Sequence, residues 1–219
     1  MTHFFLVRHG QTVWHAENRY AGSTEVELDP TGREQAERLG TWAARAKLTA
    51  IWCSPLGRAR QTAAPAARAT GLDLQMDKRL REIDFGQIEG RTMWEAEHLF
   101  PTEIRHFKTD PVAHPMPGGE DPRQAASRFV SALRDIAALC PNGRVLVVAH
   151  NTVIRLALCS LSGIPLAKYR TVFPSVRNVG LTEIRFENES VALLQYNSPL
   201  STLPIDTEPD SLTKHHLTS

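Results

Sequence analysis

The 219-residue sequence predicts an α/β fold, a three-layer α/β/α sandwich with a mostly parallel central sheet. Apolar segments of strand length alternate with amphipathic segments of helix length along nearly the whole chain. Residues typical of N-caps precede several helical segments, and glycines follow some of them. With 42% hydrophobic residues, the chain can also bury a sizeable core. Strands joined through helices pair in parallel, so we expect helices on both faces of the sheet.

The first half of the chain predicts three strands and two helices. Four apolar residues, FFLV at 4–7, form a strand that ends abruptly at a charged pair followed by Gly10. In the first helix Asp29 is expected at the N-cap and Pro30 at the first helical position. Pro65 is expected to mark a kink or a boundary in the second helix. The expected elements are a strand at 4–7, a helix at 28–46, a strand at 50–54, a helix at 58–70 ended near Gly71, and a strand at 72–77.

The second half of the chain predicts a cover, two helices, a strand and a hairpin. The stretch 91–122 contains five prolines and two short helical patches, so we expect it to pass over the sheet rather than extend it. Asp121 and Pro122 repeat the Asp-Pro start of a helix. The expected elements are a helix at 121–140, a strand at 143–150, a helix at 151–163, and a hairpin formed by 180–188 and 190–196.

The domain organisation follows from this order of elements. We expect residues 1–198 to form a single domain, with 91–122 as a cover over the functional site. Residues 199–219 are expected to form a flexible C-terminal tail. The sequence contains no internal repeat and no low-complexity linker.

Composition and charge argue against several classes of protein. The net charge of +1 gives no electrostatic basis for binding nucleic acid or an acidic membrane surface. No apolar run approaches the roughly 20 residues that cross a bilayer, and the N-terminal stretch lacks the apolar core of a signal peptide. Three scattered cysteines fit reduced thiols better than a disulfide framework. We therefore expect a cytoplasmic protein, monomeric or homodimeric, with no nucleic-acid or membrane partner.

Two of the predicted strands end in a histidine. FFLVRHG ends in Arg8 and His9, and RVLVVAH ends in His150. Because ligand sites in parallel sheets lie at the carboxyl ends of strands, these side chains are expected at one edge. Imidazole can act as nucleophile, acid or base near neutral pH, and the planar guanidinium binds tetrahedral oxyanions. The combination predicts phosphoryl chemistry.

Other phosphate-handling motifs do not explain the sequence. It contains neither the P-loop pattern nor the glycine-rich dinucleotide pattern. Residues 84–86 spell the kinase triplet Asp-Phe-Gly, but no His-Arg-Asp catalytic loop precedes it. The stretch from Cys53 to Arg58 resembles a thiol-phosphatase loop but is one residue too short, so Cys53 is expected in the core.

A metal site is not expected. His98, His106 and His114 recur every eight residues, but Pro101 and Pro111 break any single helix that could align them. The sequence shows no carboxylate-rich metal cage. We therefore predict chemistry that uses neither a metal nor another cofactor.

Four stretches identify a resemblance that extends from Phe4 to about Tyr196. LVRHGQTVW, SPLGRARQTA, LREIDFGQIEG and VVAHNTVIR resemble, in order, the signatures of the histidine phosphatase superfamily, the phosphoglycerate mutase-like proteins. The resemblance implies the fold of that family. It also implies that His9 is the nucleophile that becomes phosphohistidine and that Glu82 is the acid for the leaving oxygen. The residues implied to line the phosphate pocket are Arg8, Arg58 and His150.

The chemistry of these residues agrees with the implied roles. A backbone acceptor near Gly10 could hold the nucleophilic imidazole in one tautomer. A protonated His150 would offset the negative charge on the transferring phosphoryl group. His150 precedes a predicted helix, so the free N–H groups of Asn151 and Thr152 at the start of this helix would also bind the anion. Apolar neighbours of Glu82 would favour its protonated form.

Plainer roles remain open for three of the charged residues. Arg58 could be an exposed helix residue, and Arg60 could simply face water. Glu82 could pair with Arg79 or Arg81.

The resemblance implies further substrate contacts. Arg19 and Gly22 match the R-x-x-G loop that closes on the substrate, and Arg60 could reach a second anionic group. PGGED, which ends at Asp121, resembles the glycine-rich loop at the mouth of the site. The other residues implied to contact the substrate are Gln11, Thr12 and Ala21.

The sequence also departs from the family pattern. His15 stands where the family usually has an Asn that touches the phosphate, and Asn151 replaces a Gly. Imidazole can also donate a hydrogen bond, so we expect His15 to bind phosphate with an altered pH dependence and Asn151 to lie beside it. Glu25 and Glu27 replace the usual Asp and Pro of a neighbouring stretch.

The sequence predicts a metal-independent phosphomonoesterase that hydrolyses a small phosphorylated metabolite through a phosphohistidine on His9. LREIDFGQIEG resembles the phosphatase branch, which includes α-ribazole phosphatases and broad-specificity phosphatases. One alternative is phosphoryl transfer of the phosphoglycerate mutase type. Another is a catalytically weak binding or regulatory member, suggested by His15 and Asn151. The physiological substrate is left open.

Overall fold

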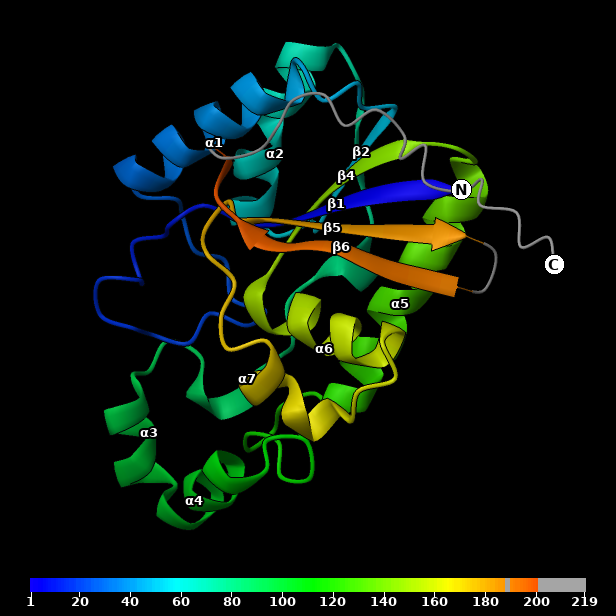
Figure 1. Cartoon of the computed structure of the whole chain (residues 1–219). Helices are drawn as coiled ribbons and strands as arrows, with labels where there is room; N and C mark the ends of the chain where they lie inside the picture. The colour runs from blue at the N-terminus through cyan, green and yellow to red at the C-terminus, as the bar shows by residue number, and fades with distance from the viewer. Residues whose placement is uncertain (188–189, 201–219) are drawn as a thin grey trace, which may run out of the picture.

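The computed structural model describes residues 1–187 and 190–200. Its centre is a six-stranded sheet in the order β3-β2-β4-β1-β5-β6, with helices on both faces (Figure 1). The α/β sandwich predicted from the sequence is confirmed. The strands are β1 (Thr2–Arg8), β2 (Ala50–Cys53), β3 (Leu74–Met76), β4 (Arg144–Ala149), β5 (Leu181–Glu187) and β6 (Ser190–Ser198).

The sheet is mostly parallel. Neighbouring strands among β1 to β4 pair in parallel, whereas β5 pairs antiparallel with both β1 and β6. β5 and β6 confirm the predicted hairpin, and β3 is shorter than the predicted strand at 72–77. β1 pairs with β4 in the register Arg8↔Ala149, so both strands end at the same edge. The residues that follow these two strands are therefore neighbours.

Helix pairs cover the two faces of the sheet (Figure 1). Alternate side chains of β1 enter the two layers, because Phe5 belongs to the cluster under α1 and α2 whereas Phe4 belongs to the cluster under α5 and α6. With both faces buried, the strand needs apolar residues at successive positions, which explains the run FFLV. The four helices are α1 (Pro30–Ala43), α2 (Gly57–Thr70), α5 (Pro122–Leu139) and α6 (Asn151–Leu161).

The start of α1 follows its sequence signal. The Asp29 carboxylate accepts a hydrogen bond from the N–H of Gly32 at 2.7 Å, and Pro30 occupies the first turn. The regular helix ends at Ala43 rather than at the predicted residue 46. Asp121 caps α5 in the same way, with its carboxylate accepting from a backbone N–H of the first turn.

Pro65 does not divide α2. The helix continues to Thr70 and ends at Gly71, whose φ of 71° is a left-handed conformation suited to glycine. Pro65 packs closely against α1, since a Cβ added to Gly40 would lie 3.0 Å from the Pro65 Cβ. Proline lacks an N–H, so α2 loses one backbone hydrogen bond at Pro65, where the helix packs closely on α1. The prediction that α2 has a boundary at Pro65 is wrong.

The stretch 91–122 contains the two predicted helical patches, and they lie beyond α6 and α7 as seen from the sheet (Figure 1). Ile88, Ala96, Ile104, Phe107 and Met116 form a small apolar core of their own between these helices. The stretch thus packs around a small apolar cluster that also includes Ile88, and Phe85 joins this cluster to the main core. The remaining helices are α3 (Met93–Leu99), α4 (Pro101–Thr109), α7 (Tyr169–Val172) and the 3₁₀ turns Lys78–Leu80, Gly86–Ile88 and Leu166–Lys168.

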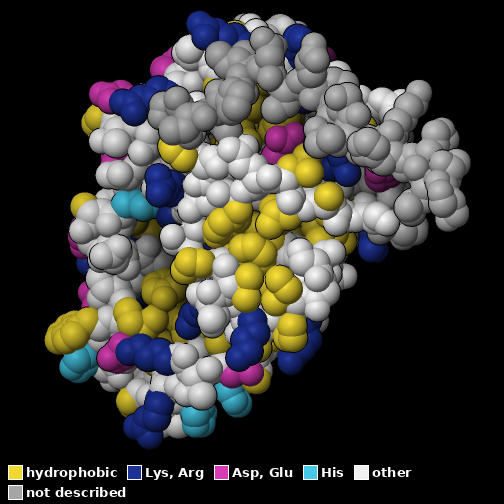
Figure 2. Space-filling view, in the orientation of Figure 1, with side chains coloured by type: hydrophobic (Ala, Val, Ile, Leu, Met, Phe, Trp, Pro, Cys, Tyr) yellow, Lys and Arg dark blue, Asp and Glu magenta, His cyan; other side chains and the backbone are white. Residues whose placement is uncertain are grey.

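β6 is an edge strand with exposed apolar side chains. Figure 2 shows apolar side chains gathered over the region where β6 runs, and Leu193 and Leu194 are 40% and 46% exposed. Leu200 packs against the cluster under α1 and α2. The rest of the predicted tail, 201–219, lies outside the described residues. No helix in the described part of the chain is long and apolar enough to cross a membrane.

Candidate active site

The two histidines that follow β1 and β4 lie side by side. The N–H of His9 donates to the carbonyl of Ala149 at 2.9 Å, which continues the β1–β4 pairing past the last residue of β1. The ring centroids of His9 and His150 are 5.1 Å apart. Both imidazoles are buried, with 6% and 0% exposure, respectively. The parallel register of the two strands thus brings the two motifs together.

His9 is held in one tautomer. Its Nδ1 lies 2.7 Å from the carbonyl oxygen of Gly10, and because a carbonyl only accepts, Nδ1 carries the hydrogen. Nε2 therefore keeps its lone pair. Burial lowers the pKa of His9 well below its usual value, and the charges of Arg58 and Arg8 lower it further. His9 is a neutral imidazole with a nucleophilic Nε2.

Arg58 is a buried cation at the start of α2, with 1% exposure. Its terminal nitrogens donate to the carbonyls of Ala21, Gly22 and Thr24 at 2.6–2.8 Å. Burial lowers the pKa of Arg58. The alternative of an exposed helix arginine is therefore wrong, and the side chain fastens the 21–24 loop to the site.

Unpaired donors converge beside His9. Among the described residues, six buried side-chain polar atoms have no hydrogen-bond partner. Four of these six belong to this site: Nε of Arg8, Nε of Arg58 and both ring nitrogens of His150. Buried polar groups are normally paired, so such a concentration marks a place built to receive acceptor atoms. Two guanidinium N–H groups and an imidazole N–H suit the oxygens of a phosphate.

His150 is neutral, contrary to the expectation from the sequence. Burial lowers its pKa well below the usual value, and the charges of Arg58 and of other arginines act in the same direction. A neutral imidazole still provides one N–H donor. The positive charge of the site therefore comes from the arginines. Arg8 has its pKa lowered to about 10, chiefly by burial, and stays charged at neutral pH.

Glu82 lies against the N-terminus of α6 with 6% exposure. Its two carboxylate oxygens accept hydrogen bonds from the N–H groups of Ile83, Thr152 and Val153, each at 2.9 Å. Three backbone donors therefore face the carboxyl group, so the setting differs from the apolar one expected from the sequence. The Thr152 N–H is also engaged by Glu82, and the expectation that it faces the phosphate is wrong.

Arg128 of α5 positions the segment before Glu82, and sequence reasoning missed it. Its terminal nitrogens donate to the backbone carbonyls of Arg79, Arg81 and Glu82 at 2.7–2.9 Å. The same guanidinium pairs with Glu120, with Nε 2.7 Å from Oε1. Arg79 pairs with Asp77 and Asp135, and Arg81 pairs with Glu120. Within the described residues, the alternative that Glu82 pairs with either arginine is therefore wrong. Nothing in the motif stretches signals Arg128, because its partners are mostly backbone atoms.

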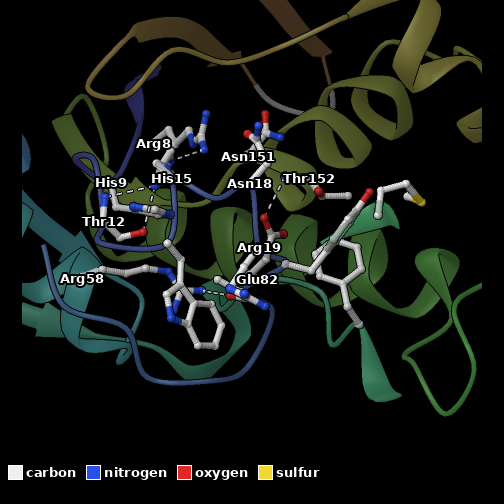
Figure 3. Close-up of a pocket in the computed structure, with 15 residues that line it drawn as sticks. Arg8, His9, Thr12, His15, Asn18, Arg19, Arg58, Glu82, Asn151 and Thr152 are labelled. Carbon is white, nitrogen blue, oxygen red and sulfur yellow. Dashed lines mark hydrogen bonds between the residues drawn. The ribbon is translucent and has the colours of Figure 1, made fainter. Parts of the chain in front are cut away.

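His15 contacts Arg8 and lies beside His9, with the centroids of the two imidazole rings 6.0 Å apart (Figure 3). Nη2 of Arg8 lies 2.8 Å from Nε2 of His15, and because arginine only donates, Nε2 is the acceptor. Nδ1 of His15 lies 2.8 Å from Oγ1 of Thr12 and 3.0 Å from the backbone nitrogen of Thr12. Burial and then the Arg8 charge lower the pKa of His15 to about 4. By accepting this hydrogen bond, His15 orients Arg8. The sequence had predicted a different role for His15, that of a hydrogen-bond donor to the phosphate.

Asn151 holds the loop that follows α7. Its Oδ1 accepts from the N–H of Val176 at 3.1 Å, while Arg8 donates to the carbonyl of the same residue at 2.8 Å. From this loop Asn178 donates to the carbonyl of His9 at 2.8 Å. Replacement of Gly by Asn151 therefore adds a tether between α6 and the loop. Sequence reasoning missed Asn178.

A cavity of about 360 Å³ opens beside His9 (Figure 3). Of the substrate contacts implied by the resemblance, Thr12, Arg19 and Ala21 line it, together with the phosphate-binding candidates Arg8, His15, Arg58 and Asn151 and with Glu82. His150 is fully buried and is not among the residues that line the cavity. Lining residues that the sequence did not single out are Trp14, Asn18, Tyr20, Phe85 and Met93.

Three predicted substrate contacts lie elsewhere. Gln11, Gly22 and Arg60 do not line the cavity, and Arg60 is exposed on α2. Arg19 lines the cavity but is engaged by protein groups, donating to the carbonyl of Gly90 at 2.7 Å and to Glu95 at 2.9 Å. It therefore links the 15–20 segment to α3.

The other reactive residues lie apart from this site. Cys53 is fully buried, and burial raises the pKa of its thiol to about 12, so it belongs to the core as predicted. Among the described residues, no three His, Cys, Asp or Glu side chains gather as metal ligands would. The chemistry of the site is that of imidazole, guanidinium and carboxylate.

Comparison with known proteins gives a coherent result. The family described as histidine phosphatase superfamily (branch 1) matches residues 4–199. The chain is 31% identical over 197 residues to "Putative phosphoserine phosphatase 2" of Hydrogenobacter thermophilus, covering 90% of this chain and 96% of that protein. It is 32% identical over 190 residues to "Probable phosphoglycerate mutase GpmB" of Salmonella choleraesuis, covering 85% of this chain and 86% of that protein.

Comparison of the fold with solved structures agrees with the family match. The solved structure of YhfR from Bacillus stearothermophilus matches with a TM-score of 0.86 at 28% identity, over 91% of this chain and 98% of that chain. The family match covers the four motif stretches and all of the sheet except the first two residues of β1. The chain belongs to branch 1 of the histidine phosphatase superfamily.

Proposed function

We propose that this protein is a phosphomonoesterase that hydrolyses a small phosphorylated metabolite through a phosphohistidine on His9. The observation that carries the proposal is the proton-free Nε2 of His9 beside the buried, unpaired donors of Arg8, Arg58 and His150. A nucleophile and oxyanion donors in one buried place are what phosphoryl transfer requires.

In the first step, the Nε2 lone pair of His9 attacks phosphorus, so that the N–P bond forms and the P–O bond to the leaving group breaks. Arg8, Arg58 and an N–H of His150 stabilise the charge on the non-bridging oxygens. A protonated Glu82 gives its proton to the leaving oxygen, and a neutral alcohol departs. Three backbone N–H groups then stabilise the carboxylate that remains.

In the second step, this carboxylate takes a proton from a water molecule whose oxygen attacks phosphorus. The N–P bond breaks, inorganic phosphate leaves, and Glu82 is again protonated. Nδ1 of His9 keeps its hydrogen on the Gly10 carbonyl throughout, so Nε2 regains its lone pair without a tautomer change.

Hydrolysis of p-nitrophenyl phosphate in the presence of EDTA tests this function. The wild-type protein is expected to release nitrophenolate with or without the chelator, and His9→Ala is expected to abolish the release. His98→Ala is the matched control, because His98 is an exposed histidine on α3 outside the cavity. A His9→Ala variant as active as wild type, or no turnover of a phosphoester panel between pH 5 and 8, would contradict the proposal.

Phosphoglycerate mutase-type transfer is the second candidate, since one relative carries that name. A mutase must keep water away from its phosphohistidine, which favours a deep lid. The cover here consists of two short helices, of seven and nine residues, which favours hydrolysis. Incubation with 3-phosphoglycerate, with and without 2,3-bisphosphoglycerate, separates the two: a hydrolase releases inorganic phosphate, and a mutase forms 2-phosphoglycerate.

A further inference from the structure

The cavity beside His9 continues into a second compartment of about 420 Å³. The two compartments share a rim to which five residues contribute, so a single ligand can extend from one into the other. The shared residues are Tyr20, Phe85, Met93, Asn151 and Thr152. The second compartment lies where the cover meets α6 and α7, because Lys108 of α4 and Tyr169 of α7 also line it.

The second compartment is cationic. Lys108, Arg155 and Arg170 line it, and neither Asp nor Glu does so among the described residues. Lys108 pairs with Glu97. Nε of Arg155 donates to the carbonyl of Phe173 at 2.5 Å, and its guanidinium carbon lies 4.7 Å from the ring centroid of Tyr169. Arg155 is buried, whereas Arg170 is partly exposed and therefore more accessible to a ligand.

Arg170 is positioned but only partly engaged. Its guanidinium carbon lies 4.4 Å from the ring centroid of Phe107 and 5.5 Å from that of Tyr169. Its Nε donates to the Tyr169 hydroxyl at 3.0 Å, whereas its terminal nitrogens make no hydrogen bond to any residue that the structure describes. Two aromatic rings therefore hold the guanidinium of Arg170 in one plane. Its two terminal nitrogens can then donate to the two oxygens of a bound carboxylate or phosphate.

Tyr20 provides a neutral donor at the junction of the compartments. Burial raises the pKa of its phenol, with the nearby Arg170 charge acting in the opposite direction. The phenol thus stays protonated, and its hydroxyl donates to no residue in the described part of the chain. Phe85, 4.9 Å away between ring centroids, holds the Tyr20 ring edge to face.

We propose that the second compartment binds a second anionic group of the substrate, with Arg170 as its principal contact. This inference rests on the proposed function, because the first anionic group is the phosphate held beside His9. The substrate class is then a phosphomonoester whose carbon skeleton carries a carboxylate or a second phosphate. The phosphate alone would be recognised by Arg8 and Arg58, and Arg170 would select among phosphomonoesters.

Matched substrate pairs test the subsite. The carboxylate pair is 3-phosphoglycerate and glycerol 1-phosphate, and the phosphate pair is glucose 1,6-bisphosphate and glucose 6-phosphate. For wild type, we expect kcat/KM to be higher for the doubly anionic member of at least one pair, and the responding pair identifies the second anion. Arg170→Gln should reduce this preference about tenfold to hundredfold, the loss typical of a charge-assisted hydrogen bond.

The controls separate selectivity from folding. Arg170→Lys keeps the charge and should retain part of the preference. Arg134→Gln, an exposed arginine of α5 outside both compartments, should change neither member of a pair. If Arg170→Gln lowers both members of a pair equally, Arg170 only joins α7 to α4 and the inference is wrong. The inference is equally wrong if wild type shows less than a threefold preference in both pairs.

Binding to the His9→Ala variant distinguishes a failed subsite from a failed function. Calorimetric dissociation constants for 3-phosphoglycerate and glycerol 1-phosphate, and for the two glucose phosphates, can be measured without turnover. A preference that Arg170→Gln removes would support the subsite even if wild type released no phosphate, in which case only the proposed hydrolysis fails. Turnover without any preference in rates or dissociation constants would remove the subsite and leave the hydrolase.

Discussion

His9 and Glu82 have opposite requirements for a proton in the proposed reaction. His9 needs a bare Nε2, and burial together with Arg58 and Arg8 lowers its pKa while Gly10 fixes the tautomer. Glu82 must alternate between acid and carboxylate, and its environment is different: three backbone N–H groups surround a side chain that is 6% exposed. The two groups thus have different surroundings: arginine side chains lie near His9, and backbone N–H groups contact Glu82.

Glu82→Gln is expected to affect substrates according to their leaving group. An alkoxide needs protonation to leave, so kcat/KM for glycerol 2-phosphate should fall about 10²- to 10⁴-fold. Nitrophenolate leaves without a proton, so kcat/KM for p-nitrophenyl phosphate should fall much less. Steady-state rates on both substrates check this, with Glu34→Gln, an exposed carboxylate of α1 outside both compartments, as control. Equal losses on both substrates would contradict the role of Glu82 as general acid.

Some residues of the site could be predicted from the sequence and others could not. His9 and His150 follow two apolar strands, and the rule that parallel strands end at one edge was enough to place them together. Arg128 and Asn178 act on backbone carbonyls, which have no sequence signature. The neutral state of His150 also escaped prediction, because it depends on burial and on a neighbouring arginine from another element.

At the scale of elements, the first turn of α1 is fitted against the loop that carries His9. A Cβ added to Gly32 would lie 2.0 Å from the carbonyl oxygen of Gln11, and one added to Gly10 would lie 2.6 Å from the carbonyl oxygen of Gly32. The N-cap that fixes the start of α1 therefore also fixes the backbone next to the nucleophile. Backbone-to-backbone contact of this kind leaves room only for glycine.

Gly32→Ala is expected to destabilise the protein although alanine favours helices. The helix propensity gain is about 1 kcal/mol, but the overlap with Gln11 must push the loop away, at a cost of about 1–3 kcal/mol more than this gain. The urea midpoint should fall, and kcat/KM for p-nitrophenyl phosphate should fall with it. Thr41→Ala, an exposed site on α1, should stay within about 0.5 kcal/mol of wild type. A Gly32→Ala variant as stable and active as wild type would contradict this account.

The elements themselves were predicted unevenly, for physical reasons. Asp-Pro caps predicted the starts of α1 and α5, and apolar periodicity predicted α6, whose first turn has no side-chain cap. Pro65 suggested a break that the structure lacks, since close packing on Gly40 compensates for the missing hydrogen bond. For the stretch 91–122, the sequence predicted only two helical patches. The cationic compartment also depends on α7, a helix of four residues that no sequence pattern predicted.

At the scale of the whole molecule, low pH should reduce the free energy of unfolding, because the histidines of the site resist protonation in the folded state. Three imidazoles from separate segments, His9, His15 and His150, meet two arginines in one buried region. Each has a pKa lowered by burial first and by the arginines next, to about 4 for His15. The folded chain therefore resists protonation that the unfolded chain accepts.

Stability is expected to rise with pH between about 4 and 6.5. In this window the unfolded histidines, with a pKa of about 6.5, bind more protons than the folded ones, so the free energy of unfolding increases as pH increases. His15→Asn removes one of the three groups and should flatten the slope by less than about 1.4 kcal/mol per pH unit, because partial exposure of His15 screens its charge. Urea unfolding at pH 4.5, 5.5 and 6.5 measures the slope, and His98→Gln, an exposed histidine, should leave it unchanged. An equal slope in wild type and His15→Asn would mean that protonation of His15 costs the folded state nothing, and the coupling between His15 and Arg8 would then be absent.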